Sequence, residues 1–242
     1  MKNEPQISLY GDAILFTLKG KTPPDFESGL EKCFDRYSQE KKNNPRCFLR
    51  TFVDTRHVTA LDFFLRNGFF ISNTMLFMER DLGDFITGLS NTDKDRLKGP
   101  ILTDLDIEEE VMFEEYRVNT GLSEYLSANA EGFGGQDPEN MIRDELNNPK
   151  SKIFVARLGG KIVSSVTVWE IEKGVFATEN VFTIPKYRNR HIAREVIKKT
   201  LLYLSDIGKT ARLSVFGDDF EAIGLYYSLG FELKEEKYEL RF

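Results

Sequence analysis

A group of basic residues lies in the stretch YRNRHIAREVI, which spans residues 187–197. Lys186, Arg188 and Arg190 precede apolar residues whose spacing predicts a helix that begins near Ile192. The first N–H groups of a helix have no partner within it, and the helix dipole adds positive charge there, so such a start binds phosphate. The stretch therefore predicts either an anion site or a basic loop on the surface, and its spacing alone does not choose between them.

The charge of the whole chain narrows the choice of anion. The 242 residues include 39 acidic and 33 basic side chains, which gives a formal net charge of -6. Proteins that bind nucleic acid use broad basic surfaces. We therefore expect no nucleic-acid partner, and a phosphorylated small ligand if the basic stretch binds an anion.

The composition predicts an ordinary globular protein of one large domain or two modest ones, since 40% of the residues are hydrophobic and 30% charged. The N-terminal MKNEPQISLY is polar, and no apolar run is long enough to span a bilayer. Cys33 and Cys47 are too few for a disulfide framework or a zinc site. We therefore expect a cytoplasmic protein, monomer or homodimer, with no bound metal and no membrane partner.

Two segments of the chain repeat each other. Residues 50–70 align with residues 212–232 without a gap, at a constant offset of 162. Five aligned pairs are identical: Arg50/Arg212, Val53/Val215, Ala60/Ala222, Gly68/Gly230 and Phe69/Phe231. Each copy predicts a strand, a turn, a helix that ends at the Gly-Phe pair, and a second strand. The shared pattern indicates a duplicated unit.

The remaining periodicity predicts a mixed sheet flanked by helices, which is an α+β fold. In the second half we expect two helices, one over residues 108–118 and one that begins at Asp137, and then three strands within residues 152–184. In the first half we expect two strands, a helix over residues 24–41 and a strand over residues 47–53. The polar segment GLSNTDKDRLKGP predicts a boundary between the halves, with domains over 1–87 and 100–242 and a linker over 88–99.

Residues 100–242 resemble the GNAT superfamily of N-acetyltransferases. The stretch VFTIPKYRNRHIA is similar to the family's coenzyme signature, a strand that ends in Pro followed by Arg/Gln-x-x-Gly-x-Gly/Ala, with Arg188 first and Ala193 last. The stretch LSVFGDDFEAIGLYYSLGF resembles the family's second signature at Ala222, Leu225, Tyr226, Gly230 and Phe231. The resemblance implies a mixed-sheet GNAT fold and acetyl-CoA as cosubstrate.

The resemblance also implies a coenzyme site. The pyrophosphate would contact the amides of the loop, and the pantetheine arm would pair with the edge of the preceding strand; the residues implied are Val181, Phe182, Thr183, Arg188, Asn189, Arg190, His191, Ile192, Ala193 and Asp219. Two of them depart from the family pattern, since His191 replaces a preferred Gly and Asp219 a usual Asn. The imidazole of His191 would either crowd the pyrophosphate or contact it when protonated, and Asp219 would add negative charge near the coenzyme arm.

Tyr226 and Glu179 are the candidate catalytic residues. Tyr226 stands at the family's general-acid position, from which its hydroxyl would protonate the leaving thiolate, although the same residue fits the apolar face of its helix. Glu179 precedes Val181 and Thr183 on what alternation predicts to be the same strand face, where burial would raise its pKa toward neutrality and make it a base. A surface glutamate at a strand end is the alternative interpretation of Glu179.

Three other features suggest further hypotheses. His57 fits a turn or a helix cap better than a catalyst. The acidic run over residues 104–116 would attract a cationic acceptor, or be the solvated face of a helix. The GFGG of residues 132–135 fits a mobile lid or an ordinary turn.

The first half has no coenzyme loop, and Phe64 stands where the second copy has Tyr226. It resembles a truncated, inactive GNAT copy with a role in packing. The resemblance implies an N-acetyltransferase that transfers an acetyl group directly to a primary amine of a small molecule or peptide. A CoA-binding sensor without activity and a protein-interaction module remain as alternatives.

Overall fold

The first half of the chain forms the elements that its periodicity predicts. In order they are β1 (Gln6–Tyr10), β2 (Ala13–Thr17), α1 (Pro23–Asn43), β3 (Phe48–Asp54), α2 (Val58–Arg66) and β4 (Phe70–Asp81). β1 and β2 pair as an antiparallel hairpin, and β2 pairs in parallel with β3. The computed structural model describes residues 5–10, 12–18, 23–101, 111–116, 121–135 and 148–242.

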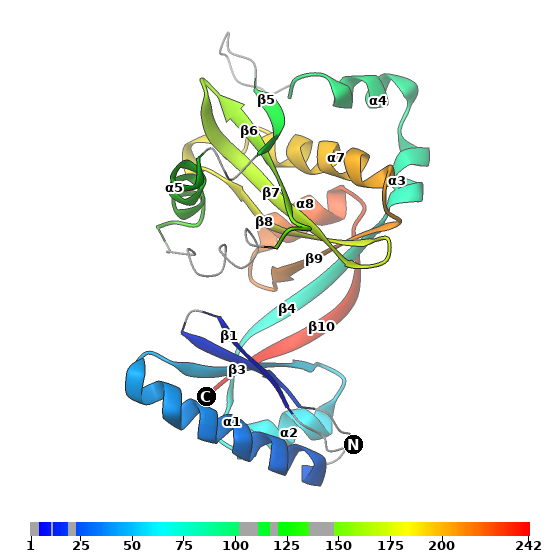
Figure 1. Cartoon of the computed structure of the whole chain (residues 1–242). Helices are drawn as coiled ribbons and strands as arrows, with labels where there is room; N and C mark the ends of the chain where they lie inside the picture. The colour runs from blue at the N-terminus through cyan, green and yellow to red at the C-terminus, as the bar shows by residue number, and fades with distance from the viewer. Residues whose placement is uncertain (1–4, 11, 19–22, 102–110, 117–120, 136–147) are drawn as a thin grey trace. The chain divides into compact units, whose positions relative to one another are not determined.

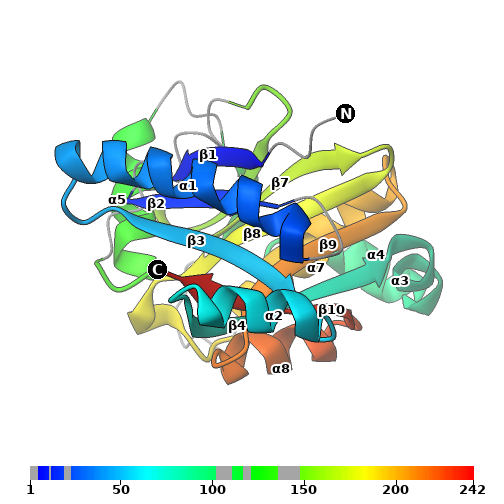
Figure 2. The ribbon, with the colours of Figure 1, turned by 90° about the horizontal axis from the view of Figure 1, so that it is seen from below.

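Helices α1 and α2 cover the same face of the β1–β3 strands (Figure 2). Phenyl rings dominate the core beneath them: Phe16, Phe26, Phe63, Phe64 and Phe69 are all at most 8% exposed. Their ring centroids lie 5.2 to 6.3 Å apart in mostly tilted and edge-on pairs, the geometry that aromatic quadrupoles favour.

The second half continues with a longer series of elements, visible in Figure 1. In order they are α3 (Leu82–Gly88), α4 (Asn91–Lys98), β5 (Met112–Tyr116), α5 (Leu122–Gly132), β6 (Lys152–Leu158), β7 (Lys161–Glu172), β8 (Val175–Thr183), the 3-10 turn η2 (Pro185–Tyr187), α7 (Ile192–Ser205), β9 (Thr210–Phe216), α8 (Phe220–Ser228) and β10 (Glu232–Arg241). Strands β5 to β8 are antiparallel neighbours, and β8 pairs in parallel with β9. The α+β mixed sheet is thereby confirmed.

The helix predicted over residues 108–118 is wrong. Its described part is strand β5, whose Tyr116 pairs with Ile153 on β6. The acidic side chains that suggested a helix face make cross-strand ion pairs instead, Glu114 with Arg157 at 2.6 Å and Glu115 with Lys152 at 3.0 Å. The helix predicted to begin at Asp137 lies outside the described residues.

The segment expected to be a linker, residues 88–99, is mostly helical. Ser90 and Asp93 form a capping box at the start of α4. The Lys199 ammonium, buried on α7, donates to the carbonyl oxygens of Leu97, at 2.6 Å, and Gly99. Arg96 on α4 forms an ion pair with Glu195 on α7, with a separation of 3.4 Å. These bonds attach α4 to α7, so this segment packs as part of the fold.

The two halves of the repeat form the same elements at the same offset. Strand β3 begins at Phe48 and β9 at Thr210, α2 at Val58 and α8 at Phe220, and β4 at Phe70 and β10 at Glu232. Gly68 and Gly230 both have a positive φ, of 87° and 78°, which ends each helix as the sequence predicts.

The repeats exchange their last strands. The strand order is β1-β2-β3-β10-β4-β9-β8-β7-β6-β5, so β10 lies beside β3 and β4 lies beside β9 (Figure 1). The chain correspondingly divides into two compact units, Met1–Phe77 with Val215–Phe220 and Leu233–Phe242, and Met78–Ser214 with Glu221–Glu232. Each unit contains strand residues from both halves of the sequence, so a single boundary along the chain does not separate them.

The repeated arginine holds each exchanged strand. Arg50 on β3 contacts Glu239 on β10, with Nε 3.0 Å from Oε1. Arg212 on β9 contacts Glu79 on β4, with Nη2 2.6 Å from Oε1. Equivalent positions thus make equivalent ion pairs in the two units.

Candidate active site

Strands β8 and β9 diverge in the middle of the second unit. Their parallel pairing joins Val175–Ala177 to Thr210–Arg212, and among the described residues the ladder ends there. Beyond that point the Glu179 carboxylate accepts hydrogen bonds from Ser214, at 3.2 Å from the backbone N–H and 3.0 Å from Oγ. A side chain therefore bridges the two strands where backbone pairing stops.

A bulge in β8 decides which way Glu179 points. Asn180 has a φ of 50°, and the register passes from Thr167↔Glu179 directly to Ser165↔Phe182. Opposite residues of an antiparallel pair share a face, so Glu179 lies on the face of Phe182. Thr183 pairs with Ser164 on the other face. The expected shared face of Glu179 and Thr183 is wrong, because the bulge breaks the alternation.

The environment of Glu179 suits proton transfer near neutral pH. Burial raises the pKa of its carboxyl to about 7, and the two hydrogen bonds from Ser214 oppose that rise. A carboxyl with such a pKa takes or gives a proton at little cost at physiological pH.

The basic loop leads into α7 through two residues in the left-handed region. Asn189 and His191 both have a φ of 60°, and α7 begins at Ile192 as predicted. The bond from Glu195 N–H to the His191 carbonyl, 3.1 Å, begins the helix, so the amides of Ile192, Ala193 and Arg194 have no intrahelical acceptor. Arg190 and His191 are exposed. The loop therefore presents donors and positive charge, which suits a phosphate.

The side chain of Arg188 has a different place from the one expected at the rim of the loop. Its Nε donates to the Thr183 carbonyl at 3.1 Å, and its Nη2 donates to the Gly132 carbonyl at 2.7 Å. The guanidinium thereby joins the end of β8 to the end of α5. Arg188 thus braces the loop.

Tyr226 lies on α8 in the second unit, 6% exposed, with its ring centroid 5.8 Å from that of Phe231. Asp219 lies in the exposed turn before α8, where its N–H donates to the Phe216 carbonyl at 3.1 Å, and it belongs to the first unit. Within the second unit, Glu179, Phe182 and Thr183 lie on β8, and Arg188 binds the Thr183 carbonyl at the end of that strand.

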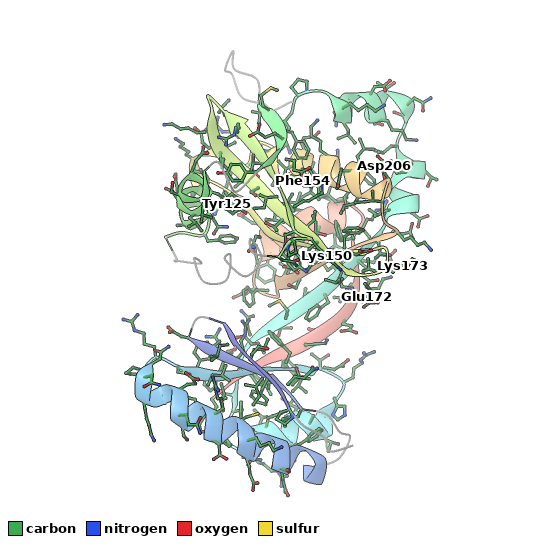
Figure 3. All side chains as sticks on the ribbon, viewed as in Figure 1. Tyr125, Lys150, Phe154, Glu172, Lys173 and Asp206 are labelled. Carbon is green, nitrogen blue, oxygen red and sulfur yellow. The ribbon has the colours of Figure 1, made fainter. Side chains whose placement is uncertain are left out.

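Helix α5 adds polar residues that the sequence did not single out. The hydroxyl of the fully buried Tyr125 lies 3.3 Å from both Thr167 Oγ1 and Ser165 Oγ. Figure 3 shows Tyr125 on the α5 side of β6 and β7, with Phe154 on the α7 side. The hydroxyls of the run VSSVTV, residues 163–168, in an otherwise apolar strand were the available signal.

Two further α5 residues approach the same face. Asn129 is fully buried, and neither its carboxamide O nor its N has a hydrogen-bond partner among the residues that the structure describes. At Gly132 a Cβ would lie 2.5 Å from the Phe182 ring, so only glycine allows this contact. A buried amide without partners is costly, which marks Asn129 as a group available to a ligand.

Two kinds of site are not found in the described part of the chain. No cluster of three or more His, Cys, Asp or Glu side chains has a geometry that would hold a metal ion. None of the described helices combines the length and apolarity needed to cross a membrane. His57, which the sequence places in a turn or a helix cap, caps α2 by accepting from the Ala60 N–H at 3.2 Å, as predicted.

Comparison with known proteins identifies the class. Residues 119–231 match the model of the acetyltransferase (GNAT) family. No curated protein is similar enough in sequence to serve as a relative. Residues 119–231 are therefore similar to the acetyltransferase (GNAT) family.

Solved structures show the same fold over nearly the whole chain. A GCN5-related N-acetyltransferase from Sphaerobacter thermophilus is 16% identical with a TM-score of 0.66, covering 98% of this chain and 75% of its own. One from Kribbella flavida is 14% identical with a TM-score of 0.65, covering 98% and 89%. A tandem GNAT protein from the clavulanic acid biosynthesis pathway is 10% identical with a TM-score of 0.65, covering 98% and 78%.

Proposed function

We propose that the protein is an acetyl-CoA-dependent N-acetyltransferase that transfers an acetyl group directly to a primary amine of a small molecule or peptide. The observation that carries the proposal is the half-buried Glu179 carboxylate at the divergence of β8 and β9, in a GNAT-family domain. The divergence leaves the edge of β8 near Val181 free of a β9 ladder partner. Such an edge suits the amides of an extended ligand arm.

The α7 loop is the proposed site for the coenzyme pyrophosphate. The amides that begin α7 supply donors, and the exposed Arg190 supplies a full charge. Two residues in the left-handed region shape the loop, and one of them, His191, stands where the family has Gly. Since glycine adopts that backbone without strain, His191 holds this conformation at some cost.

Glu179 is the proposed general base. The amine nitrogen attacks the thioester carbonyl, the C–N bond forms and the C–S bond breaks. Glu179 takes the proton from the nitrogen, which its pKa near 7 allows at physiological pH. Tyr226 is the proposed acid that returns a proton to the thiolate.

The acceptor is proposed to bind on the α5 side of β7 and β8. Tyr125, Ser165 and Thr167 place hydroxyls there, and Asn129 contributes its unpartnered carboxamide. The Asn129 carboxamide favours a polar acceptor over an apolar one, because an apolar group would leave it without hydrogen bonds.

Calorimetry with CoA and a free-thiol assay with acetyl-CoA test the proposal. The amines to supply are spermidine, glucosamine and a peptide with N-terminal alanine. Arg190→Glu should weaken CoA binding by about tenfold or more, since a hydrogen bond to a charged group contributes roughly 1.5–3 kcal/mol. Lys161→Glu, an equal charge change at the exposed first residue of β7, is the control. CoA binding without thiol release from any amine would favour the sensor alternative, and no CoA binding would overturn both.

A further inference from the structure

We propose that Ser214 is a positioning residue of this site, which holds the Glu179 carboxylate across the gap between β8 and β9 and keeps it available as a base. The inference rests on the proposed function, because it assumes that Glu179 accepts the amine proton. The contact itself is a property of the protein alone, and it can be measured without any ligand.

Ser214 lies within hydrogen-bond distance of both carboxylate oxygens of Glu179. Its Oγ lies 3.0 Å from Oε1 and 3.2 Å from Oε2 of Glu179, and its backbone N–H lies 3.2 Å from Oε1. The hydroxyl has one proton, so it donates to one oxygen at a time while the N–H donates to Oε1. Both donors stabilise the ionised carboxylate over the protonated form.

The contact replaces a strand interaction. The parallel ladder ends at Ala177↔Arg212, two residues before Ser214 on β9. A strand N–H beyond that point needs another acceptor, and the Glu179 side chain supplies it. The same bond therefore satisfies the strand edge and fixes the orientation of the proposed base.

Among the described residues, no charged side chain shifts the pKa of Glu179. On β7, the residue opposite Glu179 is the uncharged Thr167, whose hydroxyl lies near Tyr125 of α5. On β9, Arg212 is engaged by Glu79, 2.6 Å away, and by Glu172, 3.7 Å away. Burial and the two Ser214 donors are the influences on the Glu179 pKa.

The repeat offers an internal comparison. The position equivalent to Ser214 in the first copy is Phe52 on β3, which has no side-chain donor. The donor therefore occurs in the copy that has the basic loop and the phenol of Tyr226, and is missing from the copy that lacks both. This distribution fits a role in the reaction better than a role in the shared fold.

The direct test is an NMR titration of the Glu179 carboxyl carbon in the full chain, with its signal assigned by its loss in Glu179→Gln. In Ser214→Ala the midpoint should rise by about one pH unit, a tenfold gain in proton affinity, because a donor to the charged form is lost. Ser214→Thr retains a hydroxyl and should restore the wild-type midpoint. Ser214→Cys, nearly equal in size, should shift it less than alanine does.

The pH dependence of acetyl transfer gives the second readout. The rate depends on ionised Glu179, so it should rise as pH increases through about 7, and in Ser214→Ala the same rise should occur about one pH unit higher. At pH 7 kcat should fall several-fold and recover at high pH, while the KM for acetyl-CoA stays unchanged. A role in folding alone would lower the rate equally at every pH.

The possible failures are distinct. A Glu179 midpoint in Ser214→Ala within a few tenths of a unit of the wild-type value would overturn the positioning role. A shifted midpoint together with full activity of Glu179→Gln would instead overturn the assignment of Glu179 as the base, and with it the catalytic meaning of Ser214. A thermal melt of each variant confirms that the titrations are made on folded protein.

Discussion

The two copies of the repeat have the same scaffold and different chemistry. Phe64 and Phe69 pack edge-on in the first copy at 5.2 Å, and Tyr226 and Phe231 pack edge-on at the equivalent positions of the second at 5.8 Å. The second copy thus adds a hydroxyl to the same ring pair. Shared apolar positions maintain a fold, whereas the polar substitutions of one copy distinguish the candidate active site.

The contacts of the two glycines show that the exchange of strands is reciprocal. The space beside Gly68 is filled by Phe242, 3.0 Å from a Cβ built there, and the space beside Gly230 by Arg80 at 2.8 Å. Phe242 follows β10 and Arg80 lies on β4, at equivalent positions of the two copies. Each copy therefore closes its glycine turn with the last strand of the other.

The largest expected effect comes from separating the copies. Residues 100–242 expressed alone lack β4, the neighbour of β9, and should aggregate or lose cooperative unfolding because β9 is left with an open edge. Thermal unfolding followed by circular dichroism measures this. Co-expression with residues 1–99 should restore a soluble complex. A fragment as stable as the full chain, and still able to bind CoA, would show that the exchange does not matter for folding.

Removing the hydroxyl from the second copy, or adding one to the first, tests whether only the second copy uses this ring for catalysis. Tyr226→Phe should lower kcat by about 10²–10⁴-fold if the hydroxyl acts as the acid. Phe64→Tyr is the matched variant, which should leave kcat unchanged and lower stability by about 1–3 kcal/mol, because a hydroxyl is placed among phenyl rings. Equal activity of Tyr226→Phe and wild type in the thiol assay would mean that both copies use the ring for packing alone.

The repeated arginine provides a stability comparison. Glu239 is fully buried, so Arg50→Met should destabilise the protein by up to about 3 kcal/mol even though Arg241 still contacts that carboxylate. The Arg212–Glu79 pair is more exposed, and Arg212→Met should cost about 1 kcal/mol or less. Urea unfolding of both variants measures the difference. The reverse order of stabilities would contradict this account of the exchanged strands.

The smallest effect concerns the loop that the first copy lacks. His191→Gly should stabilise the protein by about 1 kcal/mol, since a non-glycine residue with a φ of 60° is strained. It should also tighten CoA binding if the imidazole crowds the pyrophosphate. Calorimetry of CoA binding separates the two roles, since relief of crowding would tighten binding in the variant and loss of an imidazole contact would weaken it. An affinity that does not depend on the substitution would exclude both roles.

Much of the local structure could be predicted from the residues. The helix start at Ile192, the turns at Gly159-Gly160 and Lys173-Gly174 and the glycine ends of α2 and α8 follow from short-range periodicity and backbone preference. The prediction over residues 108–118 was wrong because its acidic run fits a helix face as well as it fits cross-strand pairs. Its charges are paired by residues about 40 positions later, which local spacing does not reveal.

The sequence by itself determined the duplicated unit, the basic loop before α7 and the identities of Glu179 and Tyr226. Only the tertiary structure decided that β4 lies beside β9 and β10 beside β3, because the equivalent strands share one pattern and either pairing satisfies it. It also decided which face of the sheet Glu179 occupies, through a bulge at Asn180. The tertiary structure likewise decided that Ser214 donates to the Glu179 carboxylate and that Arg188 donates to the Thr183 carbonyl. Strand register and side-chain bonds depend on groups distant in the chain, and for that reason local sequence patterns do not encode them.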